Sequence, residues 1–207
     1  MRHAFPPSVK LTKLTRMSST ETKTGLDGVA AAVKQAPGRG LPPVHLWHPA
    51  HCGEIDIVIA RNGQWFHEGS PIGREALVRL FSTVLRKDPD GYYLVTPVEM
   101  MKITVEDAPF TAVQVDRVGE ALSFTTNVGD VVEAGPDNEI RVGADPVTGE
   151  PRPYLHVRRG LEAKLRRPVF YELVEMAQEH DTPDGPTLGV TSNGVWFPVG
   201  PAKAHLL

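Results

Sequence analysis

The chain has 207 residues, a length that fits one large domain or two small ones. Its composition, 41% hydrophobic and 23% charged, is typical of a folded globular protein and excludes extended disorder. The formal net charge of −3 excludes a general positive field for holding nucleic acid, so nucleic-acid binding would need a local basic patch.

A single cysteine, Cys52, excludes an intrachain disulfide, and no apolar run approaches the roughly 20 residues that cross a bilayer. We expect a cytoplasmic protein with no membrane partner and no cofactor. Residues 1–41 are predicted to form a flexible extension with a short Ala-rich helix over residues 26–36. Residues 1–16 are basic but lack the apolar segment of a secretory signal, and Met17 is an alternative start.

The first compact unit is predicted to begin with a hairpin and a helix. Residues 55–60 are rich in β-branched side chains, and Asn62-Gly63 favours a tight type I′ turn before Trp65-Phe66. Ser70 is predicted to cap a helix that Pro71 opens. The apolar side chains of that helix fall on one stripe, formed by Leu77, Leu80, Phe81, Val84 and Leu85.

The second half of the chain is dominated by β patterns. Alternating apolar and polar residues predict strands over much of residues 92–142, and two more strands follow at 154–157 and 161–165. Pro168 can open a second helix, and a second hairpin is predicted around Asn193-Gly194. We predict an α+β fold of two small domains, residues 42–108 and 109–203, with mostly antiparallel twisted sheets or a small open barrel.

The two hairpins indicate an internal repeat. Asn62-Gly63 and Trp65-Phe66 recur at one constant spacing as Asn193-Gly194 and Trp196-Phe197. A weaker echo joins Tyr93-Leu94, Glu99 and Lys102 to another set at slightly varying spacing, namely Tyr154-Leu155, Glu162 and Lys164. Duplication is one explanation, and independent selection for stable aromatic hairpins is the other.

The segment that follows the first hairpin is the main candidate ligand site. A helix N-terminus offers free backbone N–H groups and a positive dipole end, and an arginine beside it can clamp a carboxylate or phosphate. The predicted ligand-binding residues are His67, Glu68, Ser70, Gly73 and Arg74. No catalytic motif surrounds Ser70, and phosphate-binding glycine loops are absent from the sequence.

Two other constellations have weaker signals. His45, His48, His51 and Cys52 are of the types that bind zinc, but they crowd into one Pro-broken segment, so no metal site is predicted. Glu54 and Asp56 lie two apart on a strand and share a face, where they could act as an acid and base or hold a cation.

A local basic cluster in the second half is the candidate for RNA binding. It consists of Arg158, Arg159, Lys164, Arg166 and Arg167. Three glutamates dilute it, which favours a solvated strand face over a nucleic-acid site.

Long stretches of the chain resemble the bacterial domain-of-unknown-function 1285 family. The matching stretches are residues 52–57, 60–74, 77–82, 91–99, 105–110 and 168–173, within a resemblance that spans about residues 42 to 200. The resemblance implies an α+β protein with one domain to about residue 108, a second domain after it, and repeated motifs suggestive of signal transduction or binding. It implies no established activity, cofactor or catalytic residue.

The leading hypothesis is a non-enzymatic module for ligand binding or signal transduction, whose small anion or partner protein meets residues 67–74. The alternative is a metal-assisted or acid/base hydrolase-like enzyme that uses Glu54, Asp56, His67 and Glu68. The sequence leaves the oligomeric state open.

Overall fold

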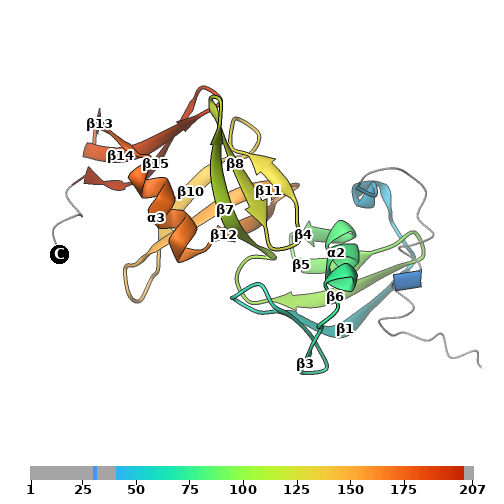
Figure 1. The fold of residues 1–207 in the computed structure, drawn as a ribbon. Coiled ribbons are helices and arrows are strands. Elements are labelled where there is room, and N and C mark those ends of the chain that lie inside the picture. The colour runs from blue at the N-terminus through green and yellow to red at the C-terminus, as the bar shows by residue number, and fades with distance from the viewer. Residues whose placement is uncertain (1–29, 32–40, 203–207) are drawn as a thin grey trace, which may run out of the picture.

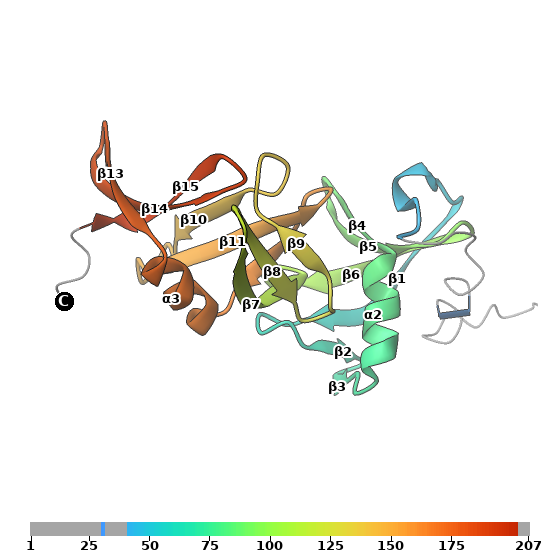
Figure 2. The ribbon, with the colours of Figure 1, turned by 45° about the horizontal axis from the view of Figure 1, so that its top comes forward.

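A computed structural model describes residues 30–31 and 41–202 of the chain. The predicted flexible extension and its helix lie outside the described residues, apart from Ala30 and Ala31, which are helical, and Leu41. The described chain has a two-domain architecture with two six-stranded sheets, and a three-stranded sheet lies at the end farthest from the first domain (Figures 1 and 2).

The first domain is a six-stranded sheet with one helix on it, and the strand order is β3-β2-β1-β6-β5-β4. After a short 3-10 turn, Val44–Leu46, its elements are β1 His51–Ile59, β2 Trp65–His67, β3 Ser70–Pro71, α2 Glu75–Thr83, β4 Leu85–Asp88, β5 Gly91–Val95 and β6 Glu99–Val105. Helix α2 is anchored by Phe81, whose ring lies 6.4 Å from the ring of Trp65.

The second domain contains the other six-stranded sheet, ordered β10-β11-β12-β7-β8-β9, and the three-stranded sheet. Its elements are β7 Phe110–Val118, β8 Ala121–Thr126, β9 Val131–Glu133, β10 Ile140–Ala144, β11 Pro151–Arg158, β12 Leu161–Leu165, α3 Arg167–Glu175, β13 Gln178–Thr182, β14 Gly185–Ser192 and β15 Val195–Pro201. The buried apolar residues of both domains form one continuous core, which includes Trp65, Phe110 and Val190.

The two large sheets share one topology. Each starts at a central strand, runs to one edge, crosses to the other edge and returns to the centre, where β1 pairs with β6 and β12 with β7 in parallel. The antiparallel prediction therefore holds except at these two central pairs. The α+β class is only roughly met, because the described helices α2 and α3 have nine residues each and the fold is mostly β.

The weaker sequence echo falls on equivalent strands of the two sheets. Tyr93 pairs with Lys102 across β5 and β6, and Tyr154 pairs with Lys164 across β11 and β12. Each tyrosine hydroxyl donates to an aspartate that also contacts the paired lysine, Asp90 for Tyr93 and Asp107, between β6 and β7, for Tyr154. The Tyr-Lys pair thus occurs at corresponding places in both sheets, although the two aspartates come from different segments, the β4–β5 turn and the β6–β7 connection.

The expected equivalence of the two Asn-Gly hairpins is wrong. Asn193 and Gly194 both have positive φ and form a two-residue turn between Ser192 and Val195, as type I′ requires. In the first hairpin only Gly63 has positive φ, and the strands pair at Ile59 and Trp65 across a longer loop. Trp65 is fully buried in a six-stranded sheet, whereas Trp196 is half-buried and stacks on His180.

The predicted first helix is also too long at both ends. Ser70 and Pro71 form strand β3 and pair with β2, so Ser70 does not cap a helix. The N-cap residue is Arg74, without a side-chain hydrogen bond. Leu85, expected on the helix stripe, begins strand β4 instead. Its side chain is buried as the stripe required, because the chain turns back over the same core.

Candidate functional site

The loop between β1 and β2 docks on the second domain and carries Arg61. The side-chain oxygen of Asn62 accepts a hydrogen bond from the Gln64 amide at 2.9 Å, which closes the loop on itself. The Asn127 side chain donates to the carbonyl oxygen of Gly63 at 3.1 Å, and its own oxygen accepts from the Thr111 amide at 2.9 Å. The side-chain amide of Asn127 thereby links the first domain to the first strand of the second domain.

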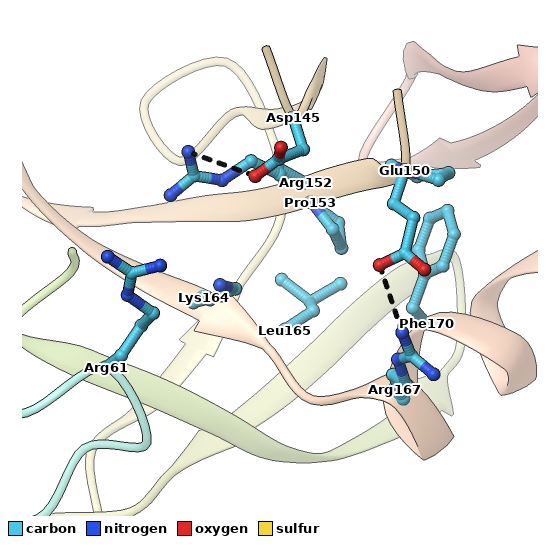
Figure 3. A pocket seen from close by; sticks show the side chains of 10 residues that line it. Arg61, Asp145, Glu150, Arg152, Pro153, Lys164, Leu165, Arg167 and Phe170 are labelled. Carbon is cyan, nitrogen blue, oxygen red and sulfur yellow. Dashed lines mark hydrogen bonds and ion pairs between the residues drawn. The ribbon is translucent and has the colours of Figure 1, made fainter. Parts of the chain in front are cut away.

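Gly63 is needed at this contact for two reasons. Its φ of +83° is a conformation that side chains rarely adopt, and a Cβ there would lie 2.9 Å from the Thr111 Cγ2 atom. The glycine residue therefore lets the two domains approach. As a result, the exposed side chain of Arg61 stands beside β12 of the second domain (Figure 3).

A buried carboxylate organises the floor of the same region. The Asp107 side chain is 5% exposed and accepts from Lys164 Nζ at 2.7 Å and from the Tyr154 hydroxyl at 2.7 Å, and it pairs with Arg152 at 3.0 Å. Burial opposes ionisation of Asp107, but the hydrogen bonds from Lys164, Tyr154 and Arg152 outweigh it and lower its pKa. Asp107 stays ionised at neutral pH and holds Lys164 and Arg152 in place.

Above this floor lies a hollow of about 210 Å³. Figure 3 shows Arg61 on one side, Arg167 paired with Glu150 on the other, and Lys164 and Leu165 between them. Arg152 reaches over it and pairs with Asp145 at 3.9 Å. Apolar side chains complete its wall, namely Pro151, Pro153, Leu165 and Phe170.

A second hollow, about 370 Å³, adjoins the first and shares Arg61, Lys164, Leu165 and Arg167 with it. Its further lining residues are Asn62, Thr111 and Arg166. Thr111 is 3% exposed and its hydroxyl has no hydrogen-bond partner, although a buried hydroxyl normally has one. We call the two hollows together the basic cleft.

The start of α3 opens onto the basic cleft. Arg166 is the N-cap residue and provides no side-chain cap, and its own N–H donates to the Ala112 carbonyl oxygen at 3.1 Å. Because Pro168 has no N–H, only the N–H groups of Arg167 and Val169 in the first turn lack an intrahelical acceptor. Arg166 and Arg167 line the cleft beside this helix end. A helix start flanked by arginine, the feature on which the sequence prediction at Arg74 rested, therefore also occurs at Arg166.

Positive charge exceeds negative charge in the basic cleft. Its walls hold Arg61, Arg152, Lys164, Arg166 and Arg167 against Asp145 and Glu150, with Asp107 beneath. Within residues 41–202, the side chains of Arg61 and Arg166 form no ion pair, although the Glu106 carboxylate accepts a hydrogen bond from the Arg61 backbone N–H at 2.9 Å. The arrangement is suited to an anion.

The structure does not gather the predicted corner residues around a hollow. His67 is half-buried on β2, and Glu68 lies in the turn to β3 with a φ of 49°. Ser70, Gly73 and Arg74 are exposed, and the five hollows described along residues 41–202 are lined by other residues.

The residues of the hydrolase alternative are split between the two faces of the first sheet. Glu54 and Asp56 are exposed and line an open hollow with Lys102. His67 pairs with the buried Ile57, so it shares a face with Ile57 and lies on the face opposite Asp56.

The histidine and cysteine cluster does not form a metal site in the described part of the chain. There, no group of three or more His, Cys, Asp or Glu side chains is arranged to hold a metal ion. Cys52 is exposed and Trp47 is half-buried.

The basic cluster predicted for RNA binding is divided. Lys164, Arg166 and Arg167 face the basic cleft, but Arg158 is tied to the domain interface. Its guanidinium donates to Asp130 and, at 2.9 Å, to the carbonyl oxygen of Ser82 in the first domain, and it lies over the Phe110 ring. Sequence reasoning missed Arg61, Arg152, Thr111 and Asp107. The one signal for Asp107 was the recurring Tyr-Lys pair that it joins.

These features define a two-domain, mostly β protein with a basic cleft where its domains meet. Family models for the N-terminal domain and the C-terminal domain of the domain of unknown function 1285 match residues 42–108 and 109–199. The chain belongs to this family.

Two solved structures are similar to this chain, and no curated protein matches it. A DUF1285 family protein from Silicibacter pomeroyi DSS-3 is 47% identical, with a TM-score of 0.76 over 84% of this chain and 96% of that one. A DUF1285 family protein from Shewanella baltica OS155 is 29% identical, with a TM-score of 0.48 over 57% of this chain and 90% of that one. Among the described residues, no helix has the length and apolarity needed to span a membrane.

Proposed function

We propose that this protein is a non-enzymatic module that binds a small anionic ligand in the basic cleft. The observation that carries the proposal is the convergence of Arg61 from one domain with Lys164 and Arg167 from the other on one hollow. A ligand bound at such a site would contact both domains at once, which suits a role in signal transduction. We also propose a cytoplasmic location, because Cys52 is the only cysteine in the sequence.

The proposal replaces residues 67–74 with the basic cleft as the binding site. Arg74 begins a helix but lines none of the five hollows described above, whereas Arg166 begins a helix and lines the basic cleft. Asp107 keeps Lys164 and Arg152 oriented before a ligand arrives, which lowers the entropic cost of binding.

Isothermal titration calorimetry with citrate, sulfate and inorganic phosphate tests the proposal. We expect at least one anion to bind, and we expect Arg61→Ala to weaken it about tenfold by removing a charge-assisted contact. Arg61 has no ion-pair partner in the described chain, so its loss should leave the fold intact.

Two arginine variants outside the basic cleft are matched controls. Arg79→Ala removes a side chain that is 61% exposed and pairs only with Glu75 on α2. Arg74→Ala tests the earlier site. Binding that Arg74→Ala abolished and Arg61→Ala left unchanged would return the site to residues 67–74.

A further inference from the structure

We propose, on the basis of the proposed function, that the anionic group is the phosphate of a small phosphate monoester, whose organic part packs against Phe170. The phosphate lies between Arg61, Lys164 and the start of α3, where the two hollows of the basic cleft join. The organic part extends into the hollow that Pro151, Pro153 and Phe170 line.

The number and spread of donors favour phosphate over carboxylate. Guanidinium groups and the Lys164 ammonium approach the basic cleft from several elements, and the first turn of α3 adds two N–H groups that lack an intrahelical acceptor. A carboxylate has two oxygens and one charge, whereas a phosphate monoester has three terminal oxygens and close to two charges at neutral pH. A helix N-terminus with basic side chains beside it is a common phosphate site.

Thr111 gives a second, independent indication of a ligand oxygen. Its hydroxyl is buried and unpartnered, and its side chain lines the hollow beside Arg166 and Lys164. A hydroxyl can donate to a phosphate oxygen, which would satisfy a group that the protein leaves without a partner.

The carboxylates at the rim favour a single phosphate on a small molecule. Asp145 and Glu150 stand beside the first hollow and would repel the successive phosphates of a nucleic acid. The two hollows, about 210 and 370 Å³, are of the size that takes a metabolite. Apolar walls at one end and cations at the other match a molecule with one charged end.

Isothermal titration calorimetry of the full chain with four probes tests the assignment: phenyl phosphate, phenyl sulfate, benzoate and inorganic phosphate. Phenyl sulfate has the tetrahedral shape of phenyl phosphate but only one charge. We expect phenyl phosphate to bind about tenfold more tightly than each of the other three.

Three substitutions test where the phosphate and the organic part of the ligand bind. Arg61→Ala and the near-isosteric Thr111→Val should each weaken phenyl phosphate several-fold, about three to tenfold, while Arg79→Ala leaves it unchanged. Phe170→Leu should weaken phenyl phosphate but not inorganic phosphate, because only the ester contacts the ring.

The outcomes separate the two proposals. If phenyl sulfate or benzoate binds as tightly as phenyl phosphate and depends on Arg61, the anion site stands and the phosphate assignment is overturned. If none of the probes, nor citrate or sulfate, binds, both proposals fail. Tighter, Arg61-dependent binding of a ten-nucleotide RNA would also overturn the assignment to a small phosphate monoester.

Discussion

At the scale of single residues, two aspartates that contact equivalent Tyr-Lys pairs differ in burial, and Asp107 also pairs with Arg152. Asp90 and Asp107 each accept from a tyrosine hydroxyl and contact the paired lysine. The Asp90 side chain is 68% exposed, while that of Asp107 is 5% exposed. The hydrogen bond to Asp90 raises the pKa of Tyr93 to about 12, so neither pair changes protonation near neutral pH.

We predict that Asp107→Asn destabilises the protein by about 2 kcal/mol at pH 7, because Lys164 and Arg152 lose a buried partner. The pKa of Asp107 is lowered in the folded protein, so its stabilising effect is complete above the unfolded-state value of roughly 4. It is lost as the pH falls through the folded-state pKa. Urea unfolding between pH 7 and pH 3 should show that the free energies of unfolding of the wild-type protein and of Asp107→Asn become similar at the acid end.

Asp90→Asn is the control for this prediction. Water screens exposed ion pairs, so this variant should lose much less stability. Equal losses in the two variants would show that burial does not set the strength of the Asp107 cluster.

A second residue-scale prediction concerns the loop that carries Arg61. Gly63→Ala should lower the free energy of unfolding by about 2 to 3 kcal/mol. The substitution strains the backbone, and it places a Cβ atom 2.9 Å from the Thr111 side chain. Gly129→Ala has a similar φ of +89° but nothing within 4 Å of the added Cβ, so it isolates the strain. Thermal unfolding of both variants measures the difference, and equal losses would remove the role of Gly63 in domain docking.

At the scale of elements, the three-stranded sheet depends on one close approach. The ring of Trp196 lies across Gly189 of β14, where a Cβ would fall 2.2 Å from the ring, and it stacks on His180 of β13. The register of β14 against β15 shifts at Leu188 and Gly189, next to this crossing. One aromatic side chain therefore spans all three strands.

We predict that Gly189→Ala displaces Trp196 and lowers stability by about 1 to 3 kcal/mol, the usual cost of overpacking. Gly200→Ala on β15 adds the same atom to open space and serves as the control. Tryptophan fluorescence and urea unfolding would follow both effects. An unchanged emission spectrum in Gly189→Ala would contradict the prediction.

At the scale of the whole molecule, the domains are joined by a shared core and a few polar contacts. Arg158 bridges them by bonding to Asp130 and to the Ser82 carbonyl oxygen while covering Phe110. Asn127 makes the second bridge, to the loop of Gly63. The basic cleft exists only because these contacts hold Arg61 beside β12.

We predict that Arg158→Met lowers the free energy of unfolding by about 2 to 3 kcal/mol, because Asp130 and the Ser82 carbonyl oxygen lose their hydrogen-bond donor. We also expect the two domains of this variant to unfold at different temperatures. The neighbouring Arg159→Met, in the exposed β11–β12 turn, should change little. Differential scanning calorimetry would report one broadened or two resolved transitions in Arg158→Met. A single sharp transition at an unchanged temperature would show that Arg158 does not couple the domains.

Much of the fold could be predicted from local patterns, and the predictions that failed did so at particular residues. Alternation identified the strands, and Pro168 correctly marked the start of the second helix. At Ser70 the sequence favoured a helix cap, but pairing with β2 made it a strand. The Asn-Gly pair set a type I′ turn at Asn193, yet at Asn62 docking against Asn127 and Thr111 accompanies a longer loop.

Local sequence patterns were enough to locate most strands, to identify the family and to reveal a basic cluster in the second half of the chain. Which basic residues act together became known from the three-dimensional arrangement, since Arg61 lies with Lys164 and Arg167 across a domain boundary while Arg158 bonds to the first domain instead. The physical reason is that strand and turn propensities act over a few residues. The basic cleft depends on contacts between segments about a hundred residues apart, which no local pattern encodes.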